Sequence, residues 1–149
     1  MADNSSSCIF CKIARGEIPA SLVAETDTAL AMMDIQPVNP GHVLVIPKSH
    51  AAYLADVDAK IGCDIFQLAM RVAAGLRNSE VRCEGVNFYL ADGKVAGQEV
   101  FHVHLHVIPR FEGDGFGLRY SPKYGEHPAR EELAKIAGSI KGAMVKGGS

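Results

Sequence analysis

The stretch "FHVHLHVIP", residues 101–109, constrains the fold of this chain more than any other feature. Histidines and apolar residues alternate along it, and this period of two is typical of a β-strand. Successive side chains of a strand point to opposite faces of the sheet. We therefore expect a strand over residues 99–108 with His102, His104 and His106 on one face. The opposite face would carry the apolar residues Phe101, Val103, Leu105 and Val107.

Three histidines in phase indicate chemistry, although a single histidine in a strand is most often an ordinary core or surface residue. A shared metal ion suits them poorly. The outer two would stand about 13 Å apart at a rise of roughly 3.3 Å per residue, whereas an imidazole reaches zinc at most about 5–6 Å from its Cβ atom. We therefore expect the three rings to have different roles.

The length and charge of the chain exclude several classes of protein. The 149 residues suit one well-cored domain and are few for two. A net charge of −2 without a basic stripe argues against a nucleic-acid partner, so a nucleotide would be met as a small molecule. The longest apolar runs are far too short to cross a membrane. Four cysteines without a disulfide framework favour a reducing, cytoplasmic setting.

The rest of the chain divides into short alternating runs and helix-like segments. The runs that predict strands, the first two as a hairpin, are residues 22–26, 28–35, 39–47 and 85–93. Helical spacing of apolar residues predicts a short helix at residues 9–13, a main helix over residues 58–78 and a C-terminal helix from about residue 129. Together these elements predict an α+β fold with an antiparallel sheet. We expect a disordered lead-in over residues 1–7 and a single domain over residues 8–149.

Two smaller motifs are ambiguous when taken alone. Cys8 and Cys11 form a C-x-x-C pair, which fits a redox pair, half of a metal site or coincidence. Cys63 and Cys83 have no such pattern, and we expect them to be packed thiols. In the loop "AGQEV", Gly97 permits a tight turn whose backbone N–H groups suit a phosphate, but a single glycine usually marks an ordinary hairpin turn.

The segment "HVHLHVI" is similar to the His-φ-His-φ-His-φ-φ signature of the histidine-triad (HIT) nucleotide hydrolases and transferases, where φ is apolar. Other blocks resemble the same family in the family's order: "CIFCKIARGEIPA", "MMDIQPVNPGHVLVIPKSH", "ADGKVAGQEVF", "IPR" and "GDGFG". The resemblance covers most of residues 8–117. It implies a HIT-like α+β fold with about five antiparallel strands, a main helix and a short N-terminal helix. The C-terminal helix would be an extension.

The resemblance also implies a reaction. The central histidine, His104, would attack the α-phosphorus of a purine nucleotide derivative, a phosphoramidate or dinucleoside polyphosphate, and water would hydrolyse the nucleotidyl-histidine intermediate. His106 would lie near the phosphate and the leaving group, and His42 would support the triad. The alternative is a non-catalytic nucleotide-binding regulatory module that uses the same pocket. A third possibility is a protein that chiefly handles zinc.

The family's nucleotide-binding positions match residues of this chain. Asp34 would accept hydrogen bonds from the ribose hydroxyls, unless it is only a turn aspartate. The remaining positions implied by the resemblance are Ile35 near the base, the phosphate loop Gly97, Gln98, Glu99 and Val100, and the two histidines His104 and His106. Ala91 departs from the pattern because many relatives carry Asn or Gln there. This leaves the phosphate contacts in doubt unless Asn87 or Asp92 substitutes.

One branch of the family implies a metal. There a zinc ion is held by a C-x-x-C pair, the histidine of a "PKxH" block and the first histidine of the triad. The matching residues here are Cys8, Cys11, His50 and His102. Such a set suits a closed tetrahedral structural site, and the alternative is plain thiols with surface histidines. The family further implies a homodimer whose sheets join across the interface.

Overall fold

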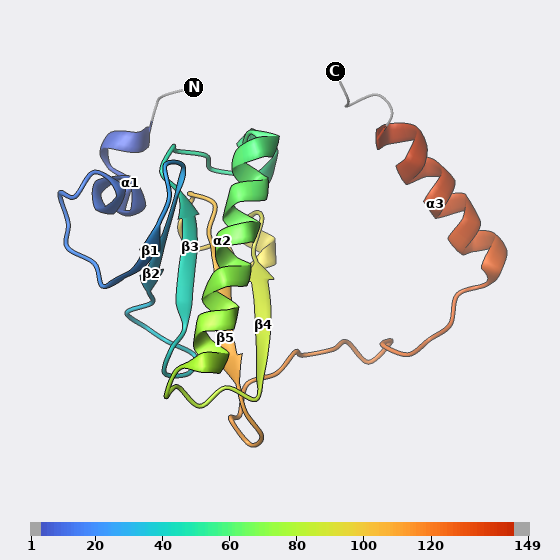
Figure 1. The fold of residues 1–149 in the computed structure, drawn as a ribbon. Helices are drawn as coiled ribbons and strands as arrows, with labels where there is room; N and C mark the ends of the chain where they lie inside the picture. Colours follow the sequence, from blue (N-terminus) through green and yellow to red (C-terminus); the bar gives the residue numbers. More distant parts are fainter. Residues whose placement is uncertain (1–3, 145–149) are drawn as a thin grey trace. The chain divides into compact units, whose positions relative to one another are not determined.

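The computed structural model describes residues 4–144. It divides into two compact units, one that ends at Phe116 and one that begins at Gly117. The first unit holds the sheet and the helices α1 (Ile9–Ala14) and α2 (Ala59–Asn78), and the second holds helix α3 (Arg130–Met144) (Figure 1). The single domain expected over residues 8–149 stays a prediction. None of the helices within residues 4–144 has the length and apolar composition needed to cross a membrane.

The first unit is built on a five-stranded antiparallel sheet with the order β1-β2-β3-β5-β4. The strands are β1 (Leu22–Glu25), β2 (Ala29–Met33), β3 (Val43–Pro47), β4 (Gly85–Leu90) and β5 (Leu105–Arg110). This confirms the expected α+β, HIT-like sheet. β5 pairs with β3 on one side and with β4 on the other, so it is an interior strand. Of the last two histidines of the triad, His106 lies in β5 and His104 lies directly before it.

The strand that carries the histidines is shorter at its start than its alternation predicts. It begins at Leu105, not at Glu99, and it continues through Pro109. Both neighbouring strands pair with it only from Leu105 onward, so no ladder partner exists for the preceding residues. There the backbone turns instead: His102 N–H donates to Val100 O at 2.9 Å and Val103 N–H to Ala51 O at 2.8 Å. As a result the Phe101 side chain is 39% exposed and does not belong to the core.

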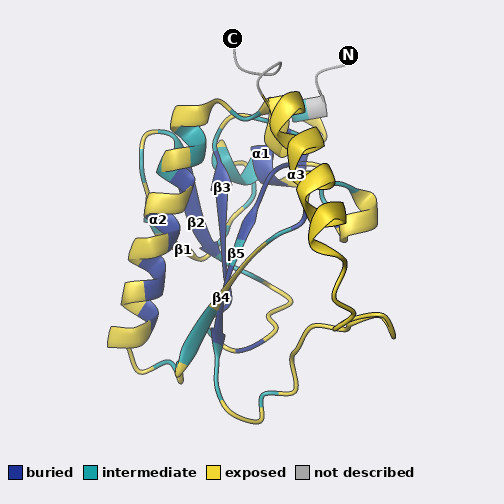
Figure 2. Ribbon diagram, turned by 90° about the vertical axis from the view of Figure 1, so that its right-hand side faces the viewer, coloured by how far each residue is buried: buried dark blue, intermediate teal, exposed yellow. Residues whose placement is uncertain are grey.

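One face of the sheet is covered by α2 (Ala59–Asn78), close to the predicted bounds (Figure 1). The carboxylate of Asp58 caps the helix by accepting from the backbone N–H groups of Lys60 and Ile61. The buried residues recur every three or four positions: Ile65, Leu68, Ala69, Val72, Ala73 and Leu76. The helix is therefore dark blue toward the sheet and yellow on its outer side (Figure 2).

The other face of the sheet is covered by the short helix α1 (Ile9–Ala14). Phe10 and Cys11 are buried there. They pack with apolar residues of β2 and β3, namely Leu30, Met32, Leu44 and Ile46. The helix ends at Arg15, and Gly16 follows with a φ of +74°, a conformation that other residues rarely adopt. This packing brings the C-x-x-C pair to the face of the sheet where the first two histidines lie.

The remaining elements are short turns and the C-terminal helix. Residues Asn4–Ser6 form a 3-10 helix, η1, where the sequence predicts a disordered lead-in, and residues 1–3 of that lead-in lie outside the described residues. Two further 3-10 helices are η2 (Leu54–Asp56) and η3 (Lys94–Ala96). The predicted C-terminal helix is α3 (Arg130–Met144).

Candidate active site and metal site

The three histidines of the triad lie in different surroundings. His102 is fully buried and lies beside Cys8 and Cys11. His106 is half-buried and contacts His42. His104 lies between them, with its ring centroid 5.0 Å from that of His106. The structure thus separates the rings as their spacing predicts.

His104 has a defined distribution of ring protons. Its Nδ1 atom lies 2.7 Å from the backbone oxygen of His102. A carbonyl oxygen can only accept, so Nδ1 carries a proton, and in the neutral form of the ring Nε2 keeps its lone pair. The side chain is 7% exposed, and the edge of the Phe10 ring packs against it with a centroid separation of 5.3 Å. Because no other hydrogen bond reaches this ring within residues 4–144, Nε2 is free to act as a nucleophile.

A backbone amide sets the protons on the next two rings. Val38 N–H donates to His42 Nδ1 at 3.1 Å, so a neutral His42 carries its proton on Nε2. That Nε2–H in turn donates to His106 Nδ1 at 2.9 Å. A neutral His106 must then carry its own proton on Nε2, the nitrogen that points away from His42. The result is a chain of donors in which Val38 N–H donates to His42 and His42 donates to His106. The free end of this chain is the Nε2–H group of His106, whose ring lies beside His104.

Both supporting rings are held in the neutral form. Burial lowers the pKa of His42, although the Asp34 carboxylate, 3.6 Å from its Nε2, acts in the opposite direction. Burial, with smaller contributions from His104 and His42, lowers the pKa of His106 to about 4. Neutral rings at pH 7 are what the donor chain requires.

Asp34 and Ile35 follow the end of β2, near this chain of histidines. One carboxylate oxygen of Asp34 accepts from Gln36 N–H at 2.8 Å, as in a turn aspartate, while the other faces His42. Its side chain is 15% exposed, so the carboxylate group is only partly covered by the protein. The Ile35 side chain is 93% exposed and would be available to pack against a planar base.

Hydrogen bonds within the protein hold the loop before the triad in shape, and they leave fewer of its backbone N–H groups for a ligand. Gly97, with a φ of +93°, donates its N–H to Lys94 O, and Gln98 N–H donates to Gly93 O. The buried Gln98 side chain accepts from Gly93 N–H and donates to Ala52 O and Val100 O. Gln98 therefore holds the loop in shape.

Of the three backbone amides expected to face a phosphate, those of Gln98, Glu99 and Val100, two are left over. Within residues 4–144, the backbone N–H groups of Glu99 and Val100 have no hydrogen-bond partner in the protein. They follow directly after the fastened turn. They are the amides of this loop that suit an anion.

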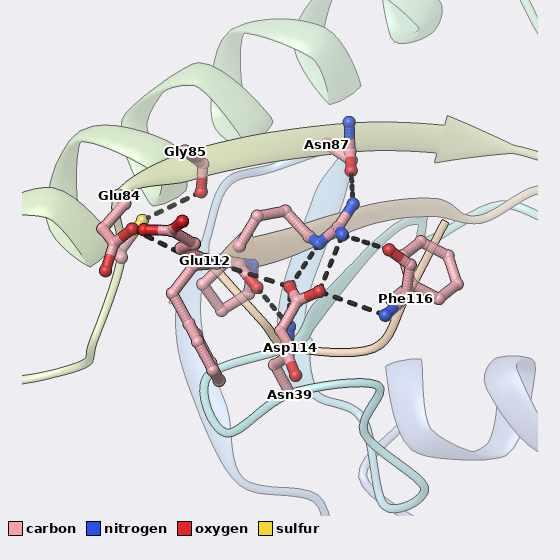
Figure 3. Close-up of polar contacts among 11 residues, drawn as sticks. Asn39, Glu84, Gly85, Asn87, Glu112, Asp114 and Phe116 are labelled. Carbon is pink, nitrogen blue, oxygen red and sulfur yellow. Dashed lines mark hydrogen bonds and ion pairs between the residues drawn. The ribbon is translucent and has the colours of Figure 1, made fainter. Parts of the chain in front are cut away.

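Both proposed substitutes for the family's Asn or Gln at Ala91 make contacts within the protein. Ala91 is buried. Asp92 accepts from Leu54 N–H at 3.0 Å, and the side-chain oxygen of Asn87 accepts from Arg110 (Figure 3). One oxygen of each side chain is thus engaged within the protein, and the alanine at position 91 adds no side-chain hydrogen bond.

The predicted metal ligands form a compact group. The donor atoms of Cys8, Cys11, His50 and His102 all lie within 4.8 Å of one another. The sulfur of Cys11 lies 3.3 Å from His50 Nδ1 and 3.5 Å from His102 Nδ1, and that of Cys8 lies 3.4 Å from His102 Nδ1. Tetrahedral zinc, with bonds of about 2.3 Å to sulfur and 2.0–2.1 Å to nitrogen, requires separations of about 3.5 Å.

The surroundings of His102 also suit a metal ligand. Its Nε2 lies 2.9 Å from Pro47 O, so Nε2 carries the proton and Nδ1 directs its lone pair at the two sulfurs. Burial lowers the pKa of His102 to about 4, which keeps the ring neutral, as a ligand must be. The donor set and its geometry fit a closed zinc site.

Comparison with known proteins agrees with these features. Residues 15–113 match the family model of the HIT domain. The chain belongs to the HIT family. It is 39% identical over 141 residues to adenosine 5'-monophosphoramidase hnt1 of Schizosaccharomyces pombe, covering 94% of this chain and 99% of that protein.

Solved structures of this HIT family share the fold. A HIT family protein from Bacillus anthracis superposes with a TM-score of 0.84 at 40% identity, over 96% of this chain and 99% of that one. A zinc-bound histidine triad family protein from Mycobacterium smegmatis superposes with a TM-score of 0.73 at 37% identity, over 91% of this chain and 99% of that one.

A second group in this HIT domain also has metal-binding side chains. Asp34, His42 and His106 place their donor atoms within 4.8 Å of one another. However, the two ring nitrogens are 2.9 Å apart and Val38 N–H occupies His42 Nδ1, which fits a shared proton better than a shared ion. We therefore assign this group to proton placement.

The roles of several groups in the site cannot be predicted from the sequence. The N–H group of Val38 and the carbonyl of Pro47 act through the backbone, so their residue types carry no signal. For Phe10 the sequence predicts only a place in the short helix and not its contact with the His104 ring. Cys63 was expected to be packed but is exposed, because it lies on the outer side of α2, whereas Cys83 is half-buried.

Proposed function

We propose that this HIT domain is a nucleotide phosphoramidase or dinucleoside polyphosphate hydrolase that cleaves at the α-phosphate of a purine nucleotide derivative. The observation that carries the proposal is the hydrogen bond from His104 Nδ1 to His102 O, at 2.7 Å, which leaves Nε2 as a free nucleophile. The phosphoramidase activity named for the Schizosaccharomyces pombe relative supports the same reaction.

The first step would form a phosphorus–nitrogen bond. His104 Nε2 attacks the α-phosphorus while the bond from phosphorus to the leaving group breaks. The leaving group takes the proton of His106 Nε2–H. The hydrogen bond from His42, at 2.9 Å, keeps His106 Nδ1 occupied, so Nε2 recovers its proton from solvent and both rings stay neutral.

The second step would reverse the first with water. Water attacks phosphorus, the phosphorus–nitrogen bond breaks and its electron pair returns to His104 Nε2. The proton released by water passes to solvent, which balances the proton taken up in the first step. The products are the nucleoside monophosphate and the protonated leaving group, and the protein ends in its starting state.

The nucleotide would be held by groups on two loops. The partly exposed carboxylate of Asp34 suits the ribose hydroxyls, and the exposed Ile35 suits a purine ring. The unpaired amides of Glu99 and Val100 suit the phosphate, next to the turn at Gly97 and close in sequence to the catalytic histidines.

Replacing the nucleophile tests the proposal. We expect His104→Ala to lower turnover of adenosine 5'-phosphoramidate by on the order of 10³-fold or more while AMP still binds, measured by product assay and calorimetry. His127→Ala is the matched control because His127 is exposed and lies outside the triad. A wild-type protein that binds AMP without turnover would favour the alternative, a non-catalytic regulatory module.

We further propose a structural zinc held by Cys8, Cys11, His50 and His102. When bound, the metal would supply no reactive group, because four protein ligands close its coordination shell. Two buried cysteines kept as thiolates for a metal also favour the cytoplasm, where thiols stay reduced.

We also propose a homodimer formed through β4. This strand lies at one edge of the sheet, and regular edge strands favour pairing with a second chain. Phe88 on β4 and Phe66 and Met70 on α2 are 40%, 52% and 56% exposed, and the two phenylalanine rings lie 5.8 Å apart. The opposite edge, β1, has four residues and an irregular register after Leu22, which suits pairing less.

A further inference from the structure

A network of partly buried ionic hydrogen bonds with no assigned role follows the triad (Figure 3). Arg110 at the end of β5 donates from Nε and Nη2 to the Asp114 carboxylate, at 2.6 and 2.8 Å. The same carboxylate accepts from the N–H groups of Phe111 and Phe116. Its side chain is only 3% exposed, and these donors hold the pKa of Asp114 well below its usual range.

Asn39 connects this network to the turn before β3. Its side-chain Nδ2 donates to Pro109 O and to Asp114, both at 2.8 Å, so both of its protons are used. The backbone oxygen of Asn39 accepts from His42 N–H at 3.0 Å. Asn39 is 5% exposed, and its buried side chain links residues 34–42 to β5.

The position of Asn39 matters because of its neighbours in the chain. Val38 precedes it directly, and the N–H of Val38 decides which nitrogen of His42 carries the proton. At the other end of the same turn, Asp34 N–H donates to His42 O at 3.0 Å. A shift of residue 39 would therefore move the amide on which the protons of His42 and His106 depend.

We infer that Asn39 is a positioning residue for the reaction. Held by Pro109 O and Asp114, it keeps Val38 N–H on His42 Nδ1 and thereby keeps a proton on His106 Nε2. The purely structural alternative is that the Arg110–Asp114 network only stabilises the end of the sheet. The two accounts differ in what happens to the histidine rings when Asn39 alone is changed.

The test compares Asn39 variants with a control in the same network. Asn39→Ala removes both donors, and Asn39→Asp places a carboxylate oxygen against Asp114 and Pro109 O. Asn87→Ala is the matched control, since Asn87 accepts from Arg110 but has no hydrogen bond to the 34–42 turn. Long-range proton–nitrogen NMR correlation spectra report which nitrogen of each ring carries the proton.

For wild type and Asn87→Ala we expect the proton on Nε2 of both His42 and His106. For both Asn39 variants we expect a mixture of the two forms at His106. The inference rests on the proposed function for its kinetic part: kcat for adenosine 5'-phosphoramidate should fall by about 10- to 100-fold, with a smaller change in KM. Asn87→Ala should stay near wild type.

Three results would overturn the inference. They are an unchanged proton distribution in the Asn39 variants, equal losses of kcat in Asn39→Ala and Asn87→Ala, or a loss that merely follows a lower Tm. If neither Asn39 variant folds, the same measurements are made on Asp114→Asn, and the same results are expected. This substitution removes an acceptor of Asn39 at constant side-chain size. An inactive wild type would refute the proposed function, while the NMR comparison would still decide the role of Asn39.

Discussion

At the scale of single residues, the chemistry of this site depends on where protons lie. Two rings receive their proton arrangement from backbone groups, His104 from a carbonyl and His42 from Val38 N–H, and His106 receives its arrangement from the His42 ring. Each arrangement leaves one nitrogen with a defined role. Placing the protons before substrate binds removes a reorganisation step from the reaction.

The lowered pKa of His106 leads to a prediction about stability. The folded protein binds this proton only near pH 4, whereas an unfolded chain binds it near the ordinary value of 6.5. Between these values the unfolded state holds more protons, so stability rises with pH. The stabilisation is complete above about 6.5 and is lost as the pH falls through about 4.

His106→Asn, which keeps an acceptor in place of Nδ1, should therefore lose less stability than wild type when the pH falls from 6.5 to 4. Urea unfolding across this range measures the difference, and any effect of zinc release is common to both proteins. Parallel curves for the two proteins would contradict the assignment of a neutral His106.

At the scale of secondary-structure elements, α1 is too short to be stable alone. Its two buried residues pack on the sheet, and its cysteine sulfurs meet His50 and His102 from segments distant in the sequence. A metal at this point would join α1 to the end of β3 and to the turn before β5. The proposed zinc site would therefore serve the packing of these elements and not the reaction itself.

We expect Cys11→Ser to abolish stoichiometric zinc binding and to lower Tm by roughly 5–15 °C, because the ligand set becomes incomplete. Turnover at temperatures where the variant is folded should stay within about tenfold of wild type. Elemental analysis and thermal unfolding measure the first two effects. Cys63→Ser is the control, since Cys63 is exposed and lies outside the cluster. A wild-type protein that contains no zinc after purification would refute the proposed zinc site.

At the scale of the whole molecule, the two edges of the sheet differ. β4 has six residues in regular register with β5, whereas β1 has four residues and an irregularity next to Leu22. The side chains around β4 also expose more aromatic surface. Assembly through β4 would extend one sheet into the next and bury Phe66, Met70 and Phe88.

Phe88→Glu should convert the dimer into a monomer, because a charge would be buried without a partner. Light scattering after size-exclusion chromatography measures the mass. Leu22→Glu is the matched control because Leu22 is an exposed apolar residue on the opposite edge strand. A monomeric wild type, or a Phe88→Glu protein that remains a dimer, would refute this interface.

Much of the fold could be read from local patterns. The apolar spacing of residues 58–78 predicts α2 almost to its ends because a single helix buries one continuous stripe. The alternation around the histidines predicts their separate roles but overextends the strand. Residues 99–104 alternate like a strand, yet β3 and β4 both end their pairing at Leu105, and a strand without neighbours cannot form.

The sequence by itself determined which side chains are available: three histidines in phase, a C-x-x-C pair and an amphipathic helix. Only the tertiary structure decided how they are used. Val38, Pro47 and Asn39 act through hydrogen bonds to partners that are distant in the chain or set by a turn, and such partners leave no periodic pattern. Side-chain periodicity records burial, whereas the positions of protons depend on which backbone groups packing brings within hydrogen-bond distance.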